Sequence, residues 1–384
     1  MSVTSASGFS ASGVACGIRK AAPDLAVVRS LVPSVGAAMF TVNRVQAAPV
    51  LVSRASLAVA EPQAVVINSG VANAATGPQG EDDARETAAE AAGLLGLDPE
   101  QVLVLSTGVI GVPLPMQKLR SGVRAAVSSL SPEGGADAAG AILTTDTGPK
   151  QSAVARGGFT VGGMAKGAGM IHPCLATMLA VVTTDYPLES GEAAAFLRPA
   201  VQASFNCISV DGECSTNDAV VLLANGASGA PRDDAAFAAA LHEVCADLAS
   251  QIVSDGEGAT VLLEIDVAGA ASDEQATAIA RRIATSPLVK TAAFGRDPNW
   301  GRVLAAAGSA QWNGGFAHLD PERVSLAFNG TTVFSAGVPV GSSPDLDGAV
   351  CRIELALGLG SGHATYLASD LSYEYVRVNA EYTT

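Results

Sequence analysis

The first third of the chain alternates between apolar runs and a segment with helical spacing. Residues 64–68 and 102–106 are mostly apolar runs with the length of buried strands. Between them, residues 81–97 are spaced as a helix, with acidic residues at 81–83 in its expected first turn. Negative charge is favourable there because it meets the positive end of the helix dipole. The pattern predicts a strand, a helix and a second strand.

The clearest helix in the chain is predicted at 236–254. Its apolar side chains recur at spacings of three and four, at Phe237, Leu241, Val244, Leu248 and Ile252. A second helix is expected at 273–284, before Pro287. Strands are predicted around these helices at 177–185, 218–224 and 261–267.

The last hundred residues are richer in strand signals. Alternating apolar positions lead into Asn329-Gly330, which is a strong hairpin signal, and residues 331–334 return. Two further strands are expected at 352–359 and 364–371. The chain is therefore predicted to be mixed α/β (α+β) with a β-rich C-terminal lobe.

Composition indicates a globular protein of the cytoplasm. The chain has 384 residues, 48% of them hydrophobic and 15% charged, whereas disordered chains are poorer in apolar residues. No apolar run approaches the length that spans a bilayer, and the start lacks a basic region followed by an apolar core. The six cysteines contain no CxxC pair and are interpreted as reduced thiols. We expect no membrane partner.

Charge and histidine usage exclude two further classes. The net charge is −15 and no basic block occurs, so a nucleic-acid partner is not expected. The four histidines show no metal-ligand spacing. We therefore expect no bound metal.

The most unusual stretch surrounds Lys166 and Thr177. Lys166 lies in a run of glycine and alanine, where the backbone can approach a ligand closely. A threonine at 177 could attack the carbonyl of Ala176, and hydrolysis of the ester would leave its hydroxyl beside its own α-amine, which can act as the base. The residues alone leave other interpretations open: a threonine that opens a strand and a glycine-rich turn.

Several blocks in this order resemble the ornithine acetyltransferases, also called glutamate N-acetyltransferases. Besides MAKGAGMIHP and LATML around the predicted cleavage point, the matching blocks are STGVIG (106–111), TTDT (144–147), SFNCISVDGECSTND (204–218), SDGEGAT (254–260), SPLVKTA (286–292), GRDPNWGRV (295–303) and the final YVRVNAEYTT. The sequence departs from the usual family pattern at Cys174, Leu175, Glu213 and Cys214. Those departures leave substrate preference open.

The resemblance implies a layered α/β/β/α architecture related to a group of aminopeptidases. It also implies self-cleavage between Ala176 and Thr177 into chains 1–176 and 177–384. These would share one core of about residues 1–230, followed by an α/β segment of about 231–290 and a C-terminal lobe of about 291–384. The two fragments would remain together and assemble as a heterotetramer or a larger particle.

The resemblance assigns a role to each matching residue. Thr177 would be the nucleophile that takes acetyl from N-acetylornithine and passes it to glutamate, and Thr107 and Gly108 would form the oxyanion hole. The implied substrate contacts are Thr144 (with Thr145 as the alternative), Lys166, Thr177, Glu257, Asn379 and Thr384. No cofactor is implied, and acetyl-CoA stays open as a co-substrate.

Three other functions remain to be separated from this one. A hydrolase of the related aminopeptidase type would pass the acyl group to water. An acetyltransferase of specialised metabolism would use the same machinery on another substrate. An uncleaved, non-enzymatic scaffold is disfavoured, because Thr107, Gly108, Lys166, Thr177 and Glu257 are all present.

Overall fold

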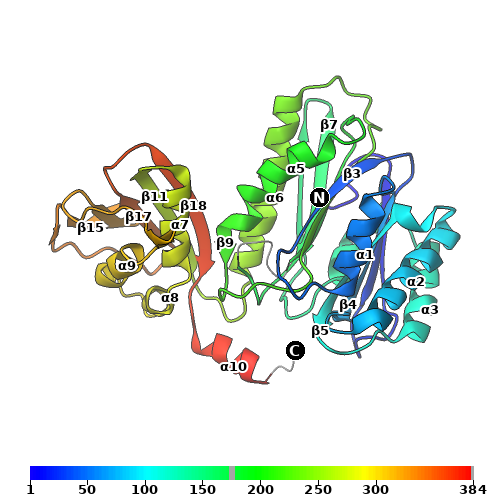
Figure 1. Ribbon diagram of the computed structural model, residues 1–384, viewed down its shortest axis with the longest axis horizontal. Helices are drawn as coiled ribbons and strands as arrows, with labels where there is room; N and C mark the ends of the chain where they lie inside the picture. The colour runs from blue at the N-terminus through cyan, green and yellow to red at the C-terminus, as the bar shows by residue number, and fades with distance from the viewer. Residues whose placement is uncertain (173–177, 382–384) are drawn as a thin grey trace. The chain divides into compact units, whose positions relative to one another are not determined.

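The computed structural model describes residues 1–172 and 178–381, which form two compact units. The first contains described residues 1–172, 178–206 and 213–252, and the second contains residues 207–212 and 253–381. The segment 231–290, expected as one part, is thus divided between the units at residue 252. Each unit is coloured along the chain in Figure 1.

Two sheets form the centre of the first unit. The four-stranded sheet has the order β1-β2-β4-β5, and the five-stranded sheet has the order β3-β10-β8-β7-β6. Their strands are β1 (Phe9–Val14), β2 (Leu25–Ser30), β3 (Val35–Phe40), β4 (Ala64–Val71), β5 (Val102–Val109), β6 (Lys150–Arg156), β7 (Phe159–Lys166), β8 (Leu179–Thr184) and β10 (Ala219–Ala224). The pairs β4/β5 and β8/β10 are parallel, and the other pairs are antiparallel.

The two sheets pack face to face through one apolar core. Val65 and Leu103 of the first sheet and Met164, Val181 and Val221 of the second are buried together in it. Strands β4 and β5 are buried on both faces, as their continuous apolar runs predicted. The prediction of strands at 64–68 and 102–106 is therefore confirmed.

Helices cover the outer face of each sheet, which gives the expected α/β/β/α layers (Figure 1). Apolar side chains of α1, α2 and α3 pack with Val27, Val66 and Val104 of the first sheet. Helices α5 and α6 lie on the far side of the second sheet. The helices of this unit are α1 (Ala48–Leu57), α2 (Gly77–Leu95), α3 (Met116–Ser128), α4 (Gly135–Ala141), α5 (Ala193–Gln202) and α6 (Asp234–Ser254).

Helix α6 confirms the helix predicted at 236–254. All five of its expected apolar positions are buried, from Phe237 to Ile252. Among the described residues, α6 is also the one helix that is long and apolar enough to cross a membrane. Half of its most apolar window is buried, and Leu248 packs beside Gly163 of β7. It therefore fits the role of a core helix.

The structure excludes one interpretation that the sequence left open and corrects one expectation. The glycine-rich stretch around 161–166 is not a turn but most of strand β7, where a Cβ on Gly162 would lie 2.3 Å from the carbonyl oxygen of Ser2. Glycine is required there by close packing. Helix α2 begins at Gly77 instead of 81, with Pro78 in its first turn, so the acidic residues 81–83 lie beyond that turn.

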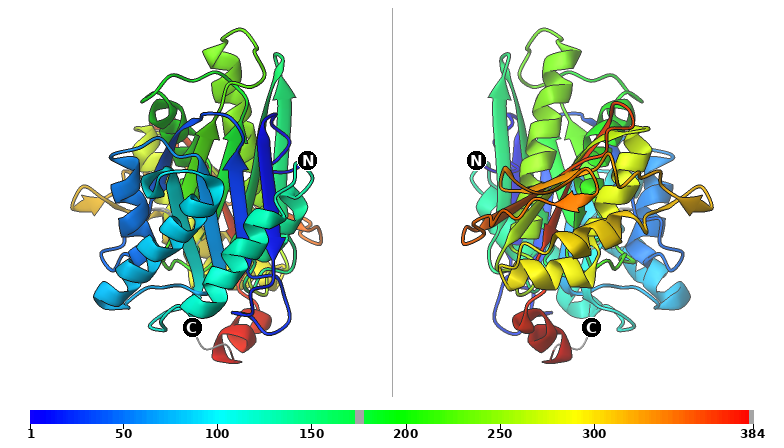
Figure 2. Two further views of the ribbon diagram at one scale, coloured as in Figure 1. Left: turned by 90° about the vertical axis from the view of Figure 1, so that its right-hand side faces the viewer. Right: turned by 90° about the vertical axis from the view of Figure 1, so that its left-hand side faces the viewer.

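The second unit is a seven-stranded sheet with helices on one face (Figure 2). The order is β16-β15-β14-β17-β11-β18-β9, and a separate pair is formed by β12 and β13. Its elements are β9 (Ile208–Ser209), β11 (Leu262–Ala270), α7 (Asp273–Ala284), α8 (Pro287–Phe294), α9 (Trp300–Ala307), β12 (Gln311–Trp312), β13 (Gly315–Phe316), β14 (Ser325–Phe328), β15 (Thr331–Ser335), β16 (Val338–Pro339), β17 (Val350–Ala356), β18 (Gly362–Ser369) and α10 (Tyr373–Glu381).

Strand β11 shows why one face of that sheet is covered. Leu263, Ile265 and Val267 are buried against the helices, whereas Glu264 and Asp266 alternate with them and bond to Arg352 and His363 on neighbouring strands. The hairpin expected at Asn329-Gly330 is present between β14 and β15. The predicted β-rich C-terminal part is therefore confirmed.

Candidate active site

Strand β5 presents Thr107 and Gly108 at an irregular point of its pairing with β4. The register shifts at Gly70 and Val71, and Gly108 has a φ of +131°. A Cβ on Gly108 would lie only 2.3 Å from the carbonyl carbon of Gly70, so only glycine fits. The Thr107-Gly108 pair therefore lies at a strand irregularity and not at the end of a regular strand.

A buried amide network holds this irregular point in place. The side-chain amide of Asn217 donates to the carbonyl oxygens of Ala72 (2.6 Å) and Ser106 (2.9 Å). Ser106 Oγ donates to Asn68 Oδ1 at 2.6 Å. The sequence analysis did not select Asn68 or Asn217. The signal that was available is an amide residue inside or directly before a buried apolar strand.

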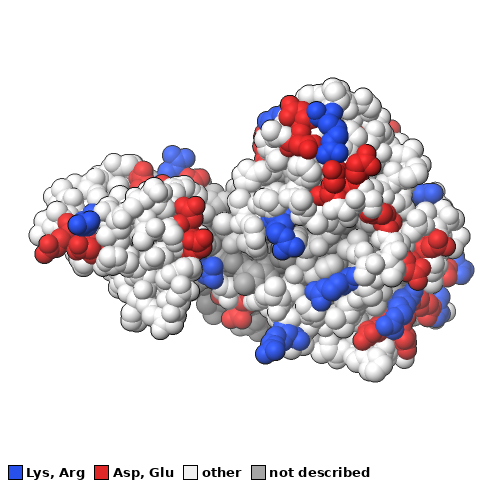
Figure 3. Space-filling view, turned by 45° about the horizontal axis from the view of Figure 1, so that its top comes forward, with Lys and Arg blue, Asp and Glu red and all other residues white. Residues whose placement is uncertain are grey.

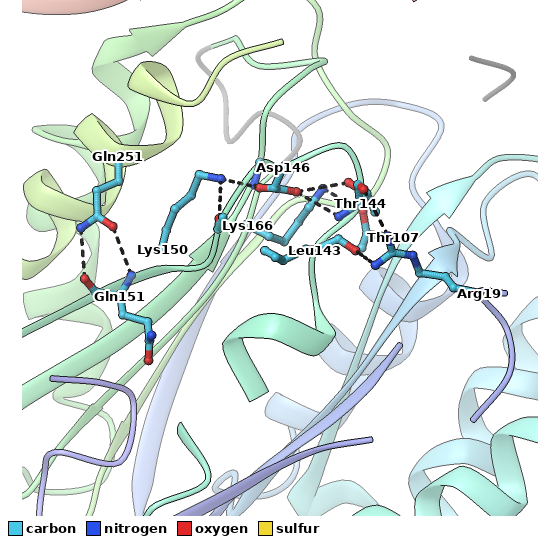
Figure 4. Close-up of polar contacts among 11 residues, drawn as sticks. Arg19, Thr107, Leu143, Thr144, Asp146, Lys150, Gln151, Lys166 and Gln251 are labelled. Carbon is cyan, nitrogen blue, oxygen red and sulfur yellow. Dashed lines mark hydrogen bonds and ion pairs between the residues drawn. The ribbon is translucent and has the colours of Figure 1, made fainter. Parts of the chain in front are cut away.

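Lys166 ends strand β7 and contacts Thr107 directly. Its ammonium nitrogen donates to Thr107 Oγ1 at 3.2 Å, and the two residues are only 2% and 3% exposed. The predicted oxyanion residue and the predicted substrate-binding lysine therefore meet, although they are 59 positions apart (Figure 4).

Asp146 joins Thr144 to this group. Its Oδ2 accepts from the N–H (3.0 Å) and hydroxyl (3.4 Å) of Thr144, and its Oδ1 accepts from Lys150 Nζ and the N–H of Gly167, both at 2.6 Å. Burial by itself would raise the pKa of Asp146, but the charges of Lys166 and Lys150 and these hydrogen bonds hold it well below its usual range. The carboxylate is therefore ionised.

Arg19 fixes the same loop from the other side. Its guanidinium donates to the carbonyl oxygens of Leu143 (2.8 Å) and Thr144 (3.5 Å). Its own backbone N–H donates to Asp24 Oδ2 at 2.7 Å. The sequence analysis missed Arg19, Asp146 and Lys150 as parts of the site; Asp146 was quoted only within a motif.

A second buried carboxylate lies beside the start of β8. Asp218 Oδ1 accepts the N–H of Met178 at 3.0 Å, and Asp218 is fully buried. Burial raises the pKa of Asp218 well above its usual value, and the nearby charge of Lys166 only partly opposes this. Met178 is the second residue after the predicted cleavage point. Ala176, Thr177 and Thr384 themselves lie outside the described residues.

The other two predicted contacts meet within the second unit. Asn379 Nδ2, on α10, donates to Glu257 Oε2 at 2.8 Å. Glu257 lies in the turn after α6, and Ser372 Oγ donates to the carbonyl oxygen of Gly258 at 2.6 Å. The structure thus joins Glu257 to Asn379 within the second unit, and joins Thr107, Thr144 and Lys166 within the first.

Surface charge gives no indication of a polyanion partner on the face drawn in Figure 3. Basic and acidic side chains are interspersed there. No group of three or more His, Cys, Asp or Glu residues that could hold a metal occurs within 1–172 and 178–381.

Fold and site together define a layered α/β/β/α enzyme whose buried lysine contacts a threonine at a strand irregularity. The ArgJ family model matches residues 10–384, and the chain belongs to the ArgJ family. It is accordingly an acyltransferase of arginine biosynthesis.

Curated relatives match over nearly their whole length. The chain is 47% identical to the arginine biosynthesis bifunctional protein ArgJ of Symbiobacterium thermophilum, covering 100% of this chain and 98% of that one. It is 49% identical to the protein of the same name from Mycolicibacterium paratuberculosis, covering 100% and 96%. Among solved structures, an ornithine acetyltransferase from Mycobacterium tuberculosis complexed with ornithine is 46% identical, with a TM-score of 0.44 over 45% of this chain and 94% of that one.

Proposed function

We propose that the protein cleaves itself between Ala176 and Thr177 and then transfers acetyl from N2-acetylornithine to glutamate. Thr177 Oγ would attack the acetyl carbonyl, the amide C–N bond would break, and ornithine would leave with the proton. The amine of glutamate would then attack the acetyl-Thr177 ester and free the hydroxyl. Each half-reaction passes through a tetrahedral oxyanion that needs preset donors.

The observation that carries this proposal is the buried contact between Lys166 and Thr107 at 3.2 Å. A cation and a hydroxyl held together beside the irregular Gly108 suit a developing oxyanion or a substrate carboxylate. Glu257, positioned by Asn379, suits the side-chain amino group of ornithine. Membership of the ArgJ family supports the same reaction.

The proposal also includes how the fragments assemble and where the protein works. The two fragments stay associated, assemble as a heterotetramer or larger particle, and work in the cytoplasm without a cofactor. Whether acetyl-CoA also serves as an acetyl donor is decided by an acetyl-transfer assay with acetyl-CoA in place of N2-acetylornithine. The substrates are small amino acids, and neither nucleic acid nor membrane takes part.

Replacing Thr177 by Ala tests the nucleophile. Wild-type protein is expected to give two masses under denaturing conditions, one of them beginning at Thr177, whereas Thr177→Ala stays full length and loses transfer activity, because the attacking hydroxyl is gone. Intact mass spectrometry and an acetyl-transfer assay measure the two effects. A cleaved or active Thr177→Ala variant contradicts the mechanism.

Omitting glutamate separates transferase from hydrolase. The proposal expects little acetate from N-acetylornithine until glutamate is added, because a site built for transfer excludes water. Rapid acetate release without glutamate would establish the hydrolase instead.

A further inference from the structure

Arg19 lies on the loop that precedes strand β2, and this loop is fixed through its backbone. The carboxylate of Asp24, which is fully buried, accepts the backbone N–H groups of Cys16 (2.6 Å), Gly17 (3.1 Å) and Arg19 (2.7 Å). These contacts do not involve the guanidinium of Arg19. The loop therefore holds the Arg19 side chain in place and leaves its charged end for contacts elsewhere.

The aliphatic part of Arg19 packs beside the strand that pairs with the proposed oxyanion hole. A Cβ added to Gly70 would lie 3.0 Å from Arg19 Cγ and 3.8 Å from Arg19 Cδ. Gly70 is paired with Gly108, and a Cβ added to Gly108 would lie 2.3 Å from the carbonyl carbon of Gly70. Gly70 thus contacts Arg19 as well as the backbone partner of Thr107.

The guanidinium of Arg19 reaches the loop of Thr144 (Figure 4). It donates to the carbonyl oxygen of Leu143 at 2.8 Å and to that of Thr144 over a longer 3.5 Å. Thr144 belongs to the same group of contacts as Thr107 and Lys166. The guanidinium therefore lies at the candidate substrate-binding residues of the first unit.

The partners of Arg19 satisfy hydrogen bonds but do not balance its charge. A guanidinium is always charged and has five N–H donors. Two of them donate to the carbonyl oxygens of Leu143 and Thr144, and the side chain forms no ion pair within residues 1–172 and 178–381. The remaining donors suit a carboxylate, whose two oxygens match the planar shape of the guanidinium.

We propose that Arg19 binds the α-carboxylate of the N-acylated amino acid, and that of glutamate in the second half-reaction. This inference rests on the proposed function. In the donor substrate three bonds separate the acetyl carbonyl carbon from the α-carboxylate carbon, so the two atoms are about 3–4 Å apart. A carboxylate bound together with an acetyl group at Thr107 and Gly108 must therefore lie close to them. Arg19 supplies a cation on that side of the site.

The test compares wild type, Arg19→Gln and Arg19→Lys in steady-state acetyl transfer. Glutamine keeps an N–H donor for the loop carbonyl oxygens but has no charge, whereas lysine keeps the charge without the planar donors. We expect Arg19→Gln to lower kcat/KM for N-acetylornithine by roughly ten- to a hundredfold, as for loss of a charged hydrogen bond. The loss should appear mainly as a higher KM, because the carboxylate is held equally in the ground state and the transition state. Arg19→Lys should lose less.

A change in the substrate separates carboxylate binding from a structural role. The α-carboxamide analogue of N-acetylornithine lacks the anion, so wild type and Arg19→Gln should use it with kcat/KM values within about threefold of each other. An arginine that only held the loop of Thr144 would cause the same loss on both substrates. An equal loss on the carboxamide therefore overturns the inference.

Two controls check the charge and the fold. Lys20→Gln removes the neighbouring cation, which is exposed, and should leave kcat/KM within about twofold of wild type because solvent screens that charge. Self-cleavage involves no substrate carboxylate, so Arg19→Gln should still produce the fragment that begins at Thr177. If Arg19→Gln does not fold, Arg19→Lys is compared with wild type on the two substrates, and its loss must again be confined to the substrate with the carboxylate.

The failure of this inference can be told from the failure of the proposed function. A wild-type protein without acetyl transfer overturns both. An active wild type, together with an Arg19→Gln variant whose KM for N-acetylornithine is unchanged, overturns the inference alone.

Discussion

At the scale of single residues, the site depends on backbone freedom that only glycine provides. Gly108 has a positive φ and lies against the backbone of Gly70. Gly70 in turn lies against Arg19: a Cβ added to Gly70 would be 3.0 Å from Arg19 Cγ. Arg19 in turn holds the carbonyl oxygens of residues 143 and 144. Two glycines therefore allow the strand irregularity and the loop of Thr144 to lie close together.

Gly108→Ala is expected to disrupt both activity and stability. The added methyl would sit 2.3 Å from the carbonyl carbon of Gly70, so the strand must shift, at a cost of about 1–3 kcal/mol. Denaturant unfolding and the transfer assay measure the two losses.

Gly93→Ala is the matched control for Gly108→Ala. Gly93 lies in α2, and a Cβ there would meet nothing within 4 Å. It should stabilise the protein by about 0.5–1 kcal/mol, because alanine favours the helix interior. A Gly108→Ala variant as stable and active as wild type would show that the close approach does not matter.

At the scale of elements, capping decides where several helices begin. Asn299, in the GRDPNWGRV block, had no assigned role in the sequence. Its side-chain oxygen accepts the N–H of Arg302 at 3.1 Å and so caps α9, whose Trp300 stacks on Phe334. The residue is thus part of the packing of the second unit.

Asn299→Ala should lower the free energy of unfolding by about 1 kcal/mol through loss of this cap. Asn299→Asp keeps an acceptor oxygen and should retain most of the stability. Urea unfolding of the three proteins measures the difference. Equal loss in both variants would indicate that the amide, which also donates to Asp297, matters more than the cap.

At the scale of the whole molecule, stability depends on how buried ionisable groups are paired. The net charge is −15, yet the second unit buries a lysine: Lys290 is 4% exposed and donates to the backbone oxygen and hydroxyl of Ser369. Burial lowers the pKa of Lys290 from 10.5 to about 8, against the opposing charges of Asp370 and Asp211. Lys290 therefore titrates within an accessible pH range.

Stability relative to Lys290→Met should rise between pH 8 and pH 10.5. In that window the unfolded state binds more protons than the folded state, so raising the pH favours folding, by roughly 3 kcal/mol in total. Below pH 8 the difference between the two proteins should be constant. Unfolding free energies measured across this range check the slope; a difference that falls with pH would contradict the lowered pKa.

The sequence by itself determined the elements that depend on local pattern, and its motifs supplied the candidate residues of the site. Strands β4 and β5, helix α6 and the β14–β15 hairpin were predictable because their apolar spacing or turn residues lie within a few positions of one another. Resemblance in short motifs identified the candidate site residues Lys166, Thr107, Glu257 and Asn379. The cleavage at Thr177 remains a prediction.

Only the tertiary structure decided what those residues touch. The glycines of β7 suggest a turn locally, but packing against Ser2 and Leu248 makes the segment a buried strand. The sequence did not indicate Lys150 as part of the site, because Lys150, Asp146 and Lys166 come together only when β6 pairs with β7. Pairing energies between buried charges depend on distances of a few ångströms, and residue spacing along the chain does not specify those distances.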